Sequence, residues 1–209
     1  MGSAADTAPT VPANLVVGVT GHRDVNHPQV VSERLAAVLE RLAPRRALCG
    51  GAQGADSLFA SAALAAAVPL EVVLPNRWYL HRYPDAVPAE LLDAAALVRF
   101  AVERPEVADW ARRWSDERWF VDNFVRNTVL VDAADLLVVV SSQRPLEVAA
   151  RRRGGTAHCV RTWAQRRGTR VLWVPDDPHL ELRWAPPAST SPARRAAVSA
   201  EPQLFSFDD

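Results

Sequence analysis

Five short apolar runs, each separated from the next by segments with helical spacing, limit the fold of this chain more than any other feature. The runs cover residues 15–19, 47–49, 70–74, 136–140 and 171–174. A short continuous apolar run is typical of a strand that is buried on both faces. Because such strands alternate with amphipathic helices, we expect a Rossmann-like, doubly wound α/β fold with a mainly parallel five-stranded sheet in the order 3-2-1-4-5.

Three glycine-rich turns lie between predicted strands and predicted helices, at residues 20–24, 50–56 and 154–156. Glycine allows backbone N–H groups to approach a ligand closely, and a helix N-terminus adds a partial positive charge. This combination favours phosphate. In the predicted strand order all three turns meet at the carboxyl ends of the central strands, so we expect one site for a nucleotide-like ligand.

The first turn supplies Gly21, His22 and Arg23 as candidate ligand-binding residues. Arg23 can pair with a phosphate, and His22 can act as a hydrogen-bond donor or general acid. In the alternative interpretation, Arg23 and Asp24 form a surface ion pair while His22 only stabilises the loop. The place of the turn at the predicted crevice favours ligand contact.

The second turn carries three glycines within five positions, Gly50, Gly51 and Gly54, which is more than a helix entry requires. We therefore expect these glycines to line the ligand. Asp56 follows in the first helical turn, where it can accept hydrogen bonds from ribose hydroxyls. It would also interact well with the helix dipole in the absence of any ligand, and the sequence leaves both roles open.

The third turn places Gly154, Gly155 and Thr156 at the start of a helix after the fourth strand. The Thr156 hydroxyl can donate to a phosphate, whereas the alternative is that Thr156 serves only as an N-cap. Because the turn follows an inner strand of the predicted sheet, we favour ligand contact and note that both roles are compatible.

Asn127 interrupts the apolar face of a helix predicted over residues 116–133. A buried Asn must find hydrogen-bond partners, so it either braces a glycine loop or reaches the ligand. We favour bracing and keep Asn127 among the ligand-site candidates. The neighbouring Arg126 and Asn123 are expected to face the same crevice.

An aromatic, helical insertion follows the third strand over residues 76–115 and contains Trp78, Tyr79 and Tyr83. These rings would serve as platforms for a base if the insertion is a lid. The alternatives are a small satellite core or an oligomer interface, and the spacing does not decide between them.

Charge and cysteine content narrow the function classes. The chain has 24 basic and 24 acidic residues, and this balance argues against binding to a nucleic acid duplex. The two cysteines, Cys49 and Cys159, are too few for a disulfide framework or a cysteine zinc site, and we expect both to be buried. Neither a metal site nor a bound cofactor is expected.

A single domain over residues 14–175 is expected, flanked by extended or disordered tails at 1–13 and 176–209. The sequence shows neither a secretory signal nor an apolar stretch long enough to span a membrane. We therefore expect a cytoplasmic protein.

The motifs Val-Thr-Gly-His-Arg, Gly-Gly-Ala-Gln-Gly-Ala-Asp and Gly-Gly-Thr, with Arg126-Asn127 before the last of them, resemble the SLOG superfamily. That superfamily gathers the YpsA-like, DprA-like and Lonely Guy-like Rossmann-type domains. The resemblance covers roughly residues 15–175 without the insertion. It implies a nucleotide pocket formed by Gly21, His22, Arg23, Gly50, Gly51, Gly54, Asp56, Gly154, Gly155 and Thr156.

Relatives of this kind are often regarded as sensors of nucleotide signals in bacterial conflict systems. The resemblance therefore implies a nucleotide-binding sensor that acts through a separate effector protein, with a homo-oligomer also possible. A weaker alternative is single-stranded DNA binding of the DprA kind, which the charge balance disfavours.

Lonely Guy-like members instead hydrolyse the N-glycosidic bond of nucleoside monophosphates with a Pro-Gly-Gly-x-Gly-Thr-x-x-Glu motif. Here Arg153 precedes the glycine pair, and Cys159 or Val160 occupies the region of the Glu. Glycoside cleavage needs a carboxylate or an equivalent group near the anomeric carbon. The alternative enzyme function would thus depend on Asp56 or Asp24, with His22 as a further catalytic candidate.

Overall fold

A computed structural model describes residues 14–82, 87–102, 116–151, 154–168 and 171–185 of the chain. Seven strands form one sheet in the order β4-β3-β2-β1-β5-β6-β7. The strands are β1 (Val16–Gly21), β2 (Arg46–Cys49), β3 (Leu70–Leu74), β4 (Leu97–Phe100), β5 (Leu136–Val140), β6 (Val171–Val174) and β7 (Arg183–Ala185). All neighbouring strands pair in parallel except β6 and β7, which are antiparallel.

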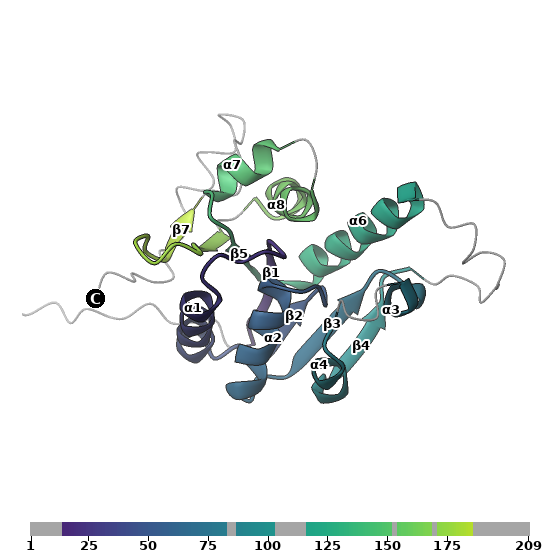
Figure 1. The fold of residues 1–209 in the computed structure, drawn as a ribbon, viewed down its shortest axis with the longest axis horizontal. Helices are drawn as coiled ribbons and strands as arrows, with labels where there is room; N and C mark the ends of the chain where they lie inside the picture. The colour runs from purple at the N-terminus through teal and green to yellow at the C-terminus, as the bar shows by residue number, and fades with distance from the viewer. Residues whose placement is uncertain (1–13, 83–86, 103–115, 152–153, 169–170, 186–209) are drawn as a thin grey trace, which may run out of the picture.

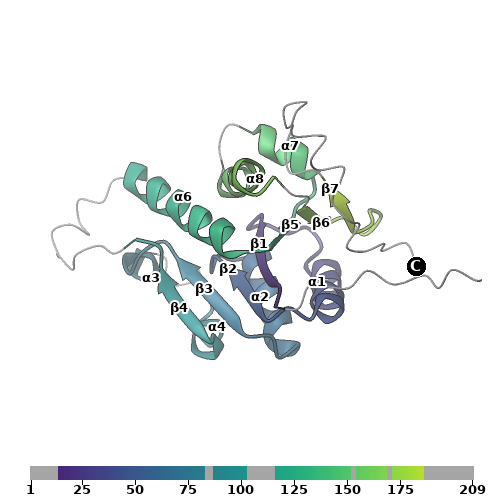
Figure 2. The same cartoon turned by 180° about the vertical axis from the view of Figure 1, so that it is seen from behind.

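The helices cover both faces of this sheet, as Figures 1 and 2 show. Helices α1 and α2 pack on one face, and α6, α7 and α8 lie on the other. The helices are α1 (Pro28–Leu42), α2 (Ala55–Ala65), α3 (Trp78–Arg82), α4 (Ala89–Ala94), α6 (Asp116–Ala133), α7 (Pro145–Ala150) and α8 (Gly155–Arg166). The fold is therefore the expected doubly wound, Rossmann-like α/β arrangement.

Successive side chains of the inner strands point to opposite faces of the sheet, and because these side chains are apolar, both faces of the sheet are apolar. In β1, Val17 and Val19 belong to the core beneath α1 and α2, whereas Val16 packs in the core beneath α6 and α8. Gly18 lies on the second face, where an added Cβ would come within 2.9 Å of Leu130 and 3.0 Å of Ala134. A side chain at this position would push α6 away from the central strand.

The five predicted strands occur in the predicted order, as β3-β2-β1-β5-β6, but two edge strands extend the sheet. The strand β4 lies within the segment predicted as an aromatic insertion. The strand β7 lies within residues 176–209, which were predicted as a tail, so regular structure continues beyond residue 175. A three-residue strand carries too little periodicity to be detected in the sequence.

The aromatic residues of the insertion that the structure describes belong to the core. Tyr79 is fully buried, and Trp78 packs against the cluster beneath α1 and α2. These two rings therefore pack in the main core beneath α1 and α2, and they do not form the separate satellite core that was one of the predicted alternatives. Tyr83 lies outside the described residues.

No helix in the described ranges has both the length and the apolar character needed to cross a membrane.

Candidate functional site

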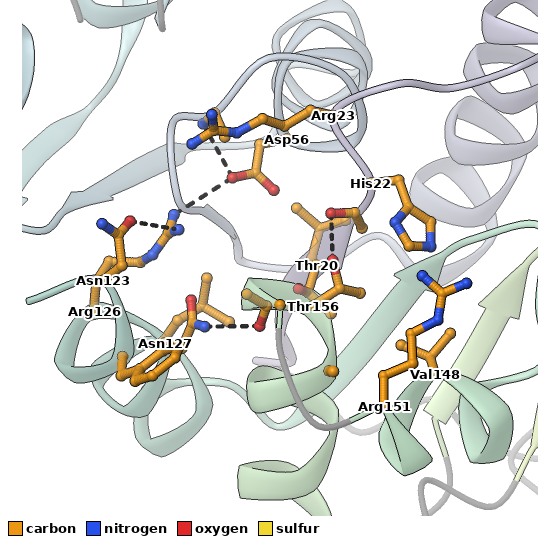
Figure 3. A pocket seen from close by; sticks show the side chains of 18 residues that line it. Thr20, His22, Arg23, Asp56, Asn123, Arg126, Asn127, Val148, Arg151 and Thr156 are labelled. Carbon is orange, nitrogen blue, oxygen red and sulfur yellow. Dashed lines mark hydrogen bonds and ion pairs between the residues drawn. The ribbon is translucent and has the colours of Figure 1, made fainter. Parts of the chain in front are cut away.

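A cavity of about 420 Å³ lies at the carboxyl end of β1, where the sheet connections change direction. It is shown in Figure 3. Its walls come from the β1–α1 loop, the start of α2, one face of α6, and the segment that joins α7 to α8. The lining residues are Val19, Thr20, Gly21, His22, Arg23, Ala52, Asp56, Asn123, Phe124, Arg126, Asn127, Leu130, Val148, Arg151, Gly154, Gly155, Thr156 and Ala157.

The amino end of α8 opens into this cavity. Gly154 occupies the N-cap position with φ +118°, and no described side chain caps the helix. The His158 N–H donates to the carbonyl of the N-cap residue Gly154, and the N–H groups of the preceding first-turn residues have no partner within the helix. An added Cβ on Gly155 would meet no atom of the described residues within 4 Å. These amides and the helix dipole make this end a suitable place for an anion.

Two side chains brace the third glycine turn against the rest of the site. The Asn127 Nδ2 donates to the Gly155 carbonyl at 2.9 Å, which is the bracing role expected of it. The Thr156 hydroxyl donates to the Gly21 carbonyl at 2.6 Å. Thr156 is therefore not the N-cap, and its hydroxyl proton is directed at β1 rather than at a ligand. The hydroxyl oxygen is the atom that remains available as an acceptor.

Asp56 is the carboxylate of the cavity and lies between two arginines, as Figure 3 shows. Its Oδ2 atom accepts a hydrogen bond from the Ala52 N–H at 3.1 Å and lies 3.6 Å from Nη1 of Arg126. Burial raises the pKa of Asp56, and Arg126, the Ala52 and Gly50 N–H groups, and Arg23 act in the opposite direction. Asp56 thus pairs with Arg126 and interacts electrostatically with Arg23.

Arg126 has few close partners for a guanidinium with only 11% of its side chain exposed. Its ion pair with Asp56 spans 3.6 Å, and its Nη2 lies 3.5 Å from the Asn123 Oδ1. The buried Nε has no hydrogen-bond partner among the residues that the structure describes. Both contacts are longer than a usual hydrogen bond, so donors on this guanidinium can turn to a ligand.

The three glycines of the second turn do not line the cavity, contrary to expectation, and each is needed for packing. A Cβ on Gly50 would lie 1.4 Å from Nη1 of Arg126, so this glycine makes room for the guanidinium. Gly51 has φ +68° and packs against apolar side chains of β3. Gly54 has φ +76°, and an added Cβ would collide with the carbonyl oxygens of His22 and Arg23.

His22 and Arg151 face each other at the end of the cavity opposite Arg126 (Figure 3). Burial lowers the pKa of His22 from 6.5, and Arg151 adds to this effect, while Asp176 and Asp24 oppose it. Asp24 itself is exposed and does not line the cavity. The structure therefore brings His22 and Arg23 into the cavity but leaves Asp24 outside it.

Arg151 is a lining residue that the sequence analysis did not identify. It lies in a run of three arginines directly before the third glycine turn, and that run was the available signal. The Nη1 atom of Arg161 donates to the backbone carbonyls of Ala149 and Arg151, which fixes this end of α7. Within the described residues, no group of three or more His, Cys, Asp or Glu side chains is arranged to hold a metal ion.

Comparisons with known proteins show likeness at the level of structure only. No protein-family model and no curated protein matched the chain. One solved structure that it is similar to is TM1055, a structural-genomics target, with a TM-score of 0.44 and 16% identity over 72% of this chain and 69% of the other. Another is the molybdenum cofactor binding protein of the phototrophic bacterium Rippkaea orientalis, with a TM-score of 0.49 and 15% identity over 79% and 78% of the two chains. The Rossmann-like assignment made above rests on the strand order of this chain.

Proposed function

We propose that the cavity binds a nucleotide or a nucleotide-derived ligand through its phosphate. The observation that carries this proposal is the uncapped amino end of α8, which opens into a cavity lined by three arginines and a single carboxylate. The arginines are Arg23, Arg126 and Arg151. With Asp56 ionised, these groups leave an excess of positive charge that an anionic ligand would neutralise.

The shape and lining of the cavity favour a nucleotide over a bare anion. Its volume of about 420 Å³ lies within the range of roughly 300 to 1,000 Å³ that is usual for small-molecule sites. One part of the wall is apolar and includes Phe124, Leu130 and Val148. Such a surface suits a base or sugar, while the α8 end and the arginines suit the phosphate.

We assign the chain to the SLOG superfamily as part of this proposal, because each of its three glycine motifs contributes residues to the wall of one cavity, the second through Ala52 and Asp56. A role as a cytoplasmic nucleotide sensor follows from that assignment. A sensor of this kind would act on a separate effector protein or through a homo-oligomer.

Isothermal titration against a panel of nucleoside mono- and diphosphates, cyclic nucleotides and ADP-ribose tests the binding proposal. We expect binding to at least one member, and a loss of about tenfold or more in Arg126→Met, since a hydrogen bond to a charged group contributes about 1.5–3 kcal/mol. Arg45→Met is the matched control, because Arg45 is exposed, outside the lining set, and bonded to the Asn14 carbonyl. Absence of binding across the panel would refute the proposal.

The second candidate function is hydrolysis of a nucleotide N-glycosidic bond, which the position of Asp56 in the cavity wall favours. Asp24 is not a candidate for this role in the observed geometry, since it does not line the cavity. Cys159 and Val160, in the region of the Lonely Guy glutamate, are both buried in the core. Incubation with nucleoside monophosphates and chromatography for free base tests this candidate, and release that is lost in Asp56→Asn would rank it first.

A further inference from the structure

Asp176 fixes the loop that carries His22 and Arg23, although it lies in the segment that the sequence analysis treated as a tail. It follows β6 directly after Pro175 and is only 2% exposed. Its Oδ2 atom accepts hydrogen bonds from both the backbone N–H of Asn26, at 3.2 Å, and the Asn26 Nδ2, at 3.1 Å. This carboxylate therefore joins the end of β6 to the β1–α1 loop.

The segment around Asp176 is itself held by α1. Arg34 donates to the backbone carbonyls of Pro175, Asp177 and Leu180. A guanidinium with several backbone acceptors restricts the segment to one geometry. The Asp176 carboxylate is therefore a fixed point against which the β1–α1 loop is placed.

The second carboxylate oxygen of Asp176 is the unexplained feature. Oδ1 is buried and has no hydrogen-bond partner among the described residues. A buried acceptor without a partner costs roughly 1–3 kcal/mol, and more when the group is charged. The negative charge acts on His22, since it opposes the effects of burial and of Arg151 on the pKa of the imidazole.

His22 is surrounded by charges of both signs. Arg151 faces the imidazole from the segment after α7. Asp176, in the segment after β6, and Asp24, in the same loop as His22, act on the imidazole through their negative charges. Burial and Arg151 disfavour the imidazolium and lower the pKa of His22. An anion bound between Arg151 and His22 would add negative charge on the cavity side and reverse that balance.

We propose that Asp176 is a positioning residue of the candidate site. Asp176 anchors the His22–Arg23 loop and supplies the buried negative charge that lets His22 take up a proton when an anion enters the cavity. This inference rests on the proposed function and deepens it, because ligand binding becomes coupled to proton uptake. Anion affinity should then increase as the pH falls, and the increase should depend on the Asp176 carboxylate.

The coupling is measured first without ligand, by NMR titration of the His22 imidazole in the full chain. Asp176→Asn should lower the pKa of His22 further, because it removes a negative charge that favours the imidazolium. Asp177→Asn removes the same charge one residue away, where the side chain bonds to the His179 N–H, and should leave His22 nearly unchanged. Equal effects of the two variants, or no effect of Asp176→Asn, overturn the inference.

The affinity is then measured with inorganic sulfate, which keeps its charge between about pH 5.5 and 8.5. Because one linked proton changes affinity by at most about tenfold per pH unit, we expect roughly five- to tenfold tighter binding at pH 5.5 than at pH 7.5. In Asp176→Asn this ratio should shrink to about twofold. Asn26→Ala loses the side-chain hydrogen bond but keeps the carboxylate, so it should weaken binding at both pH values and preserve the ratio.

Each outcome has a distinct meaning. If Asp176→Asn weakens sulfate binding equally at both pH values, as Asn26→Ala does, then Asp176 is only an anchor and the charge coupling is refuted. If the wild-type chain binds neither sulfate nor any nucleotide, the proposed function fails and ligand-linked proton uptake fails with it. The NMR comparison of His22 still decides in that case whether Asp176 controls the imidazole.

Discussion

Replacing Gly155 by alanine separates ligand binding from folding more cleanly than any other change at the site. Gly155 is the first residue of α8, and an added Cβ would have no atom within 4 Å in the part of the chain that the structure describes. Alanine is the better helix former, by about 1 kcal/mol at an interior position and by less at a terminus. Gly155→Ala should therefore leave the free energy of unfolding unchanged or raise it by up to about 1 kcal/mol.

The same methyl group should weaken binding if the α8 amides hold the phosphate. It would stand on the cavity side of the helix terminus and keep an anion from reaching the N–H groups. The loss of one charge-assisted hydrogen bond corresponds to about 1.5–3 kcal/mol, or roughly 10- to 150-fold in affinity. Urea denaturation measures the first effect, and isothermal titration with the best nucleotide of the panel measures the second.

Gly54→Ala is the contrasting variant, because its glycine is required by the fold. Gly54 has φ +76°, and a Cβ would lie 2.1 Å from the Arg23 carbonyl oxygen and 2.6 Å from that of His22. The backbone conformation alone costs about 1–3 kcal/mol for alanine, and the clash with backbone atoms adds to this cost. If Gly155→Ala destabilises the protein as Gly54→Ala does, or if it binds nucleotide as tightly as the wild type, the anion site at α8 is wrongly placed.

Three further predictions concern the remainder of the molecule. Glu71 is 1% exposed and is paired with Arg46 and Arg99. Glu71→Gln should lower the free energy of unfolding in urea by about 1–2 kcal/mol, which is less than for a fully buried pair because both arginines are about one-third exposed. Glu40→Gln, at an exposed position, should change the free energy of unfolding little. Burial lowers the pKa of His158 below 6.5, so the folded state binds fewer protons than the unfolded state. The free energy of unfolding should therefore fall as the pH drops below about 6.5. His158→Gln should reduce the slope of the free energy of unfolding against pH. Burial raises the pKa of both cysteine thiols to about 12, so a colourimetric thiol reagent at pH 8 should find no reactive thiol in the native protein and two after unfolding.

The sequence was sufficient to predict the five inner strands of the sheet, because these strands are short apolar runs buried on both faces. Residues 136–140, for example, form a fully buried strand next to β1, and the helix over 116–133 has the bounds that its pattern predicted. The residues that the glycine motifs bring to the cavity follow from that strand order. Topology places His22, Asp56 and Thr156 together even though they are far apart along the chain.

The sequence did not reveal why individual residues occupy their positions. Gly50 and Gly155 look alike in a motif, yet Gly50 makes room for Arg126, whereas Gly155 faces an open cavity. The distinction depends on a side chain from another element, 76 residues away in the case of Gly50 and Arg126 (126 − 50 = 76). Asp176 was missed for a related reason, since its partners lie on the β1–α1 loop and no local pattern marks it.

One helix joins the parts of the site that the sequence presents as separate motifs. Asn123, Arg126 and Asn127 lie at spacings of three and four along α6, so they share one helical face. Arg126 fills the space beside Gly50 and pairs with Asp56 on the second turn, while Asn127 bonds to the Gly155 carbonyl on the third. Thr156 in turn donates to the Gly21 carbonyl, and the Ala55 N–H donates to the His22 carbonyl, so the first turn is bonded directly to the other two while α6 connects the second turn to the third. A shift of α6 along its axis would therefore move Arg126 and the Asn127 contact to the Gly155 carbonyl together.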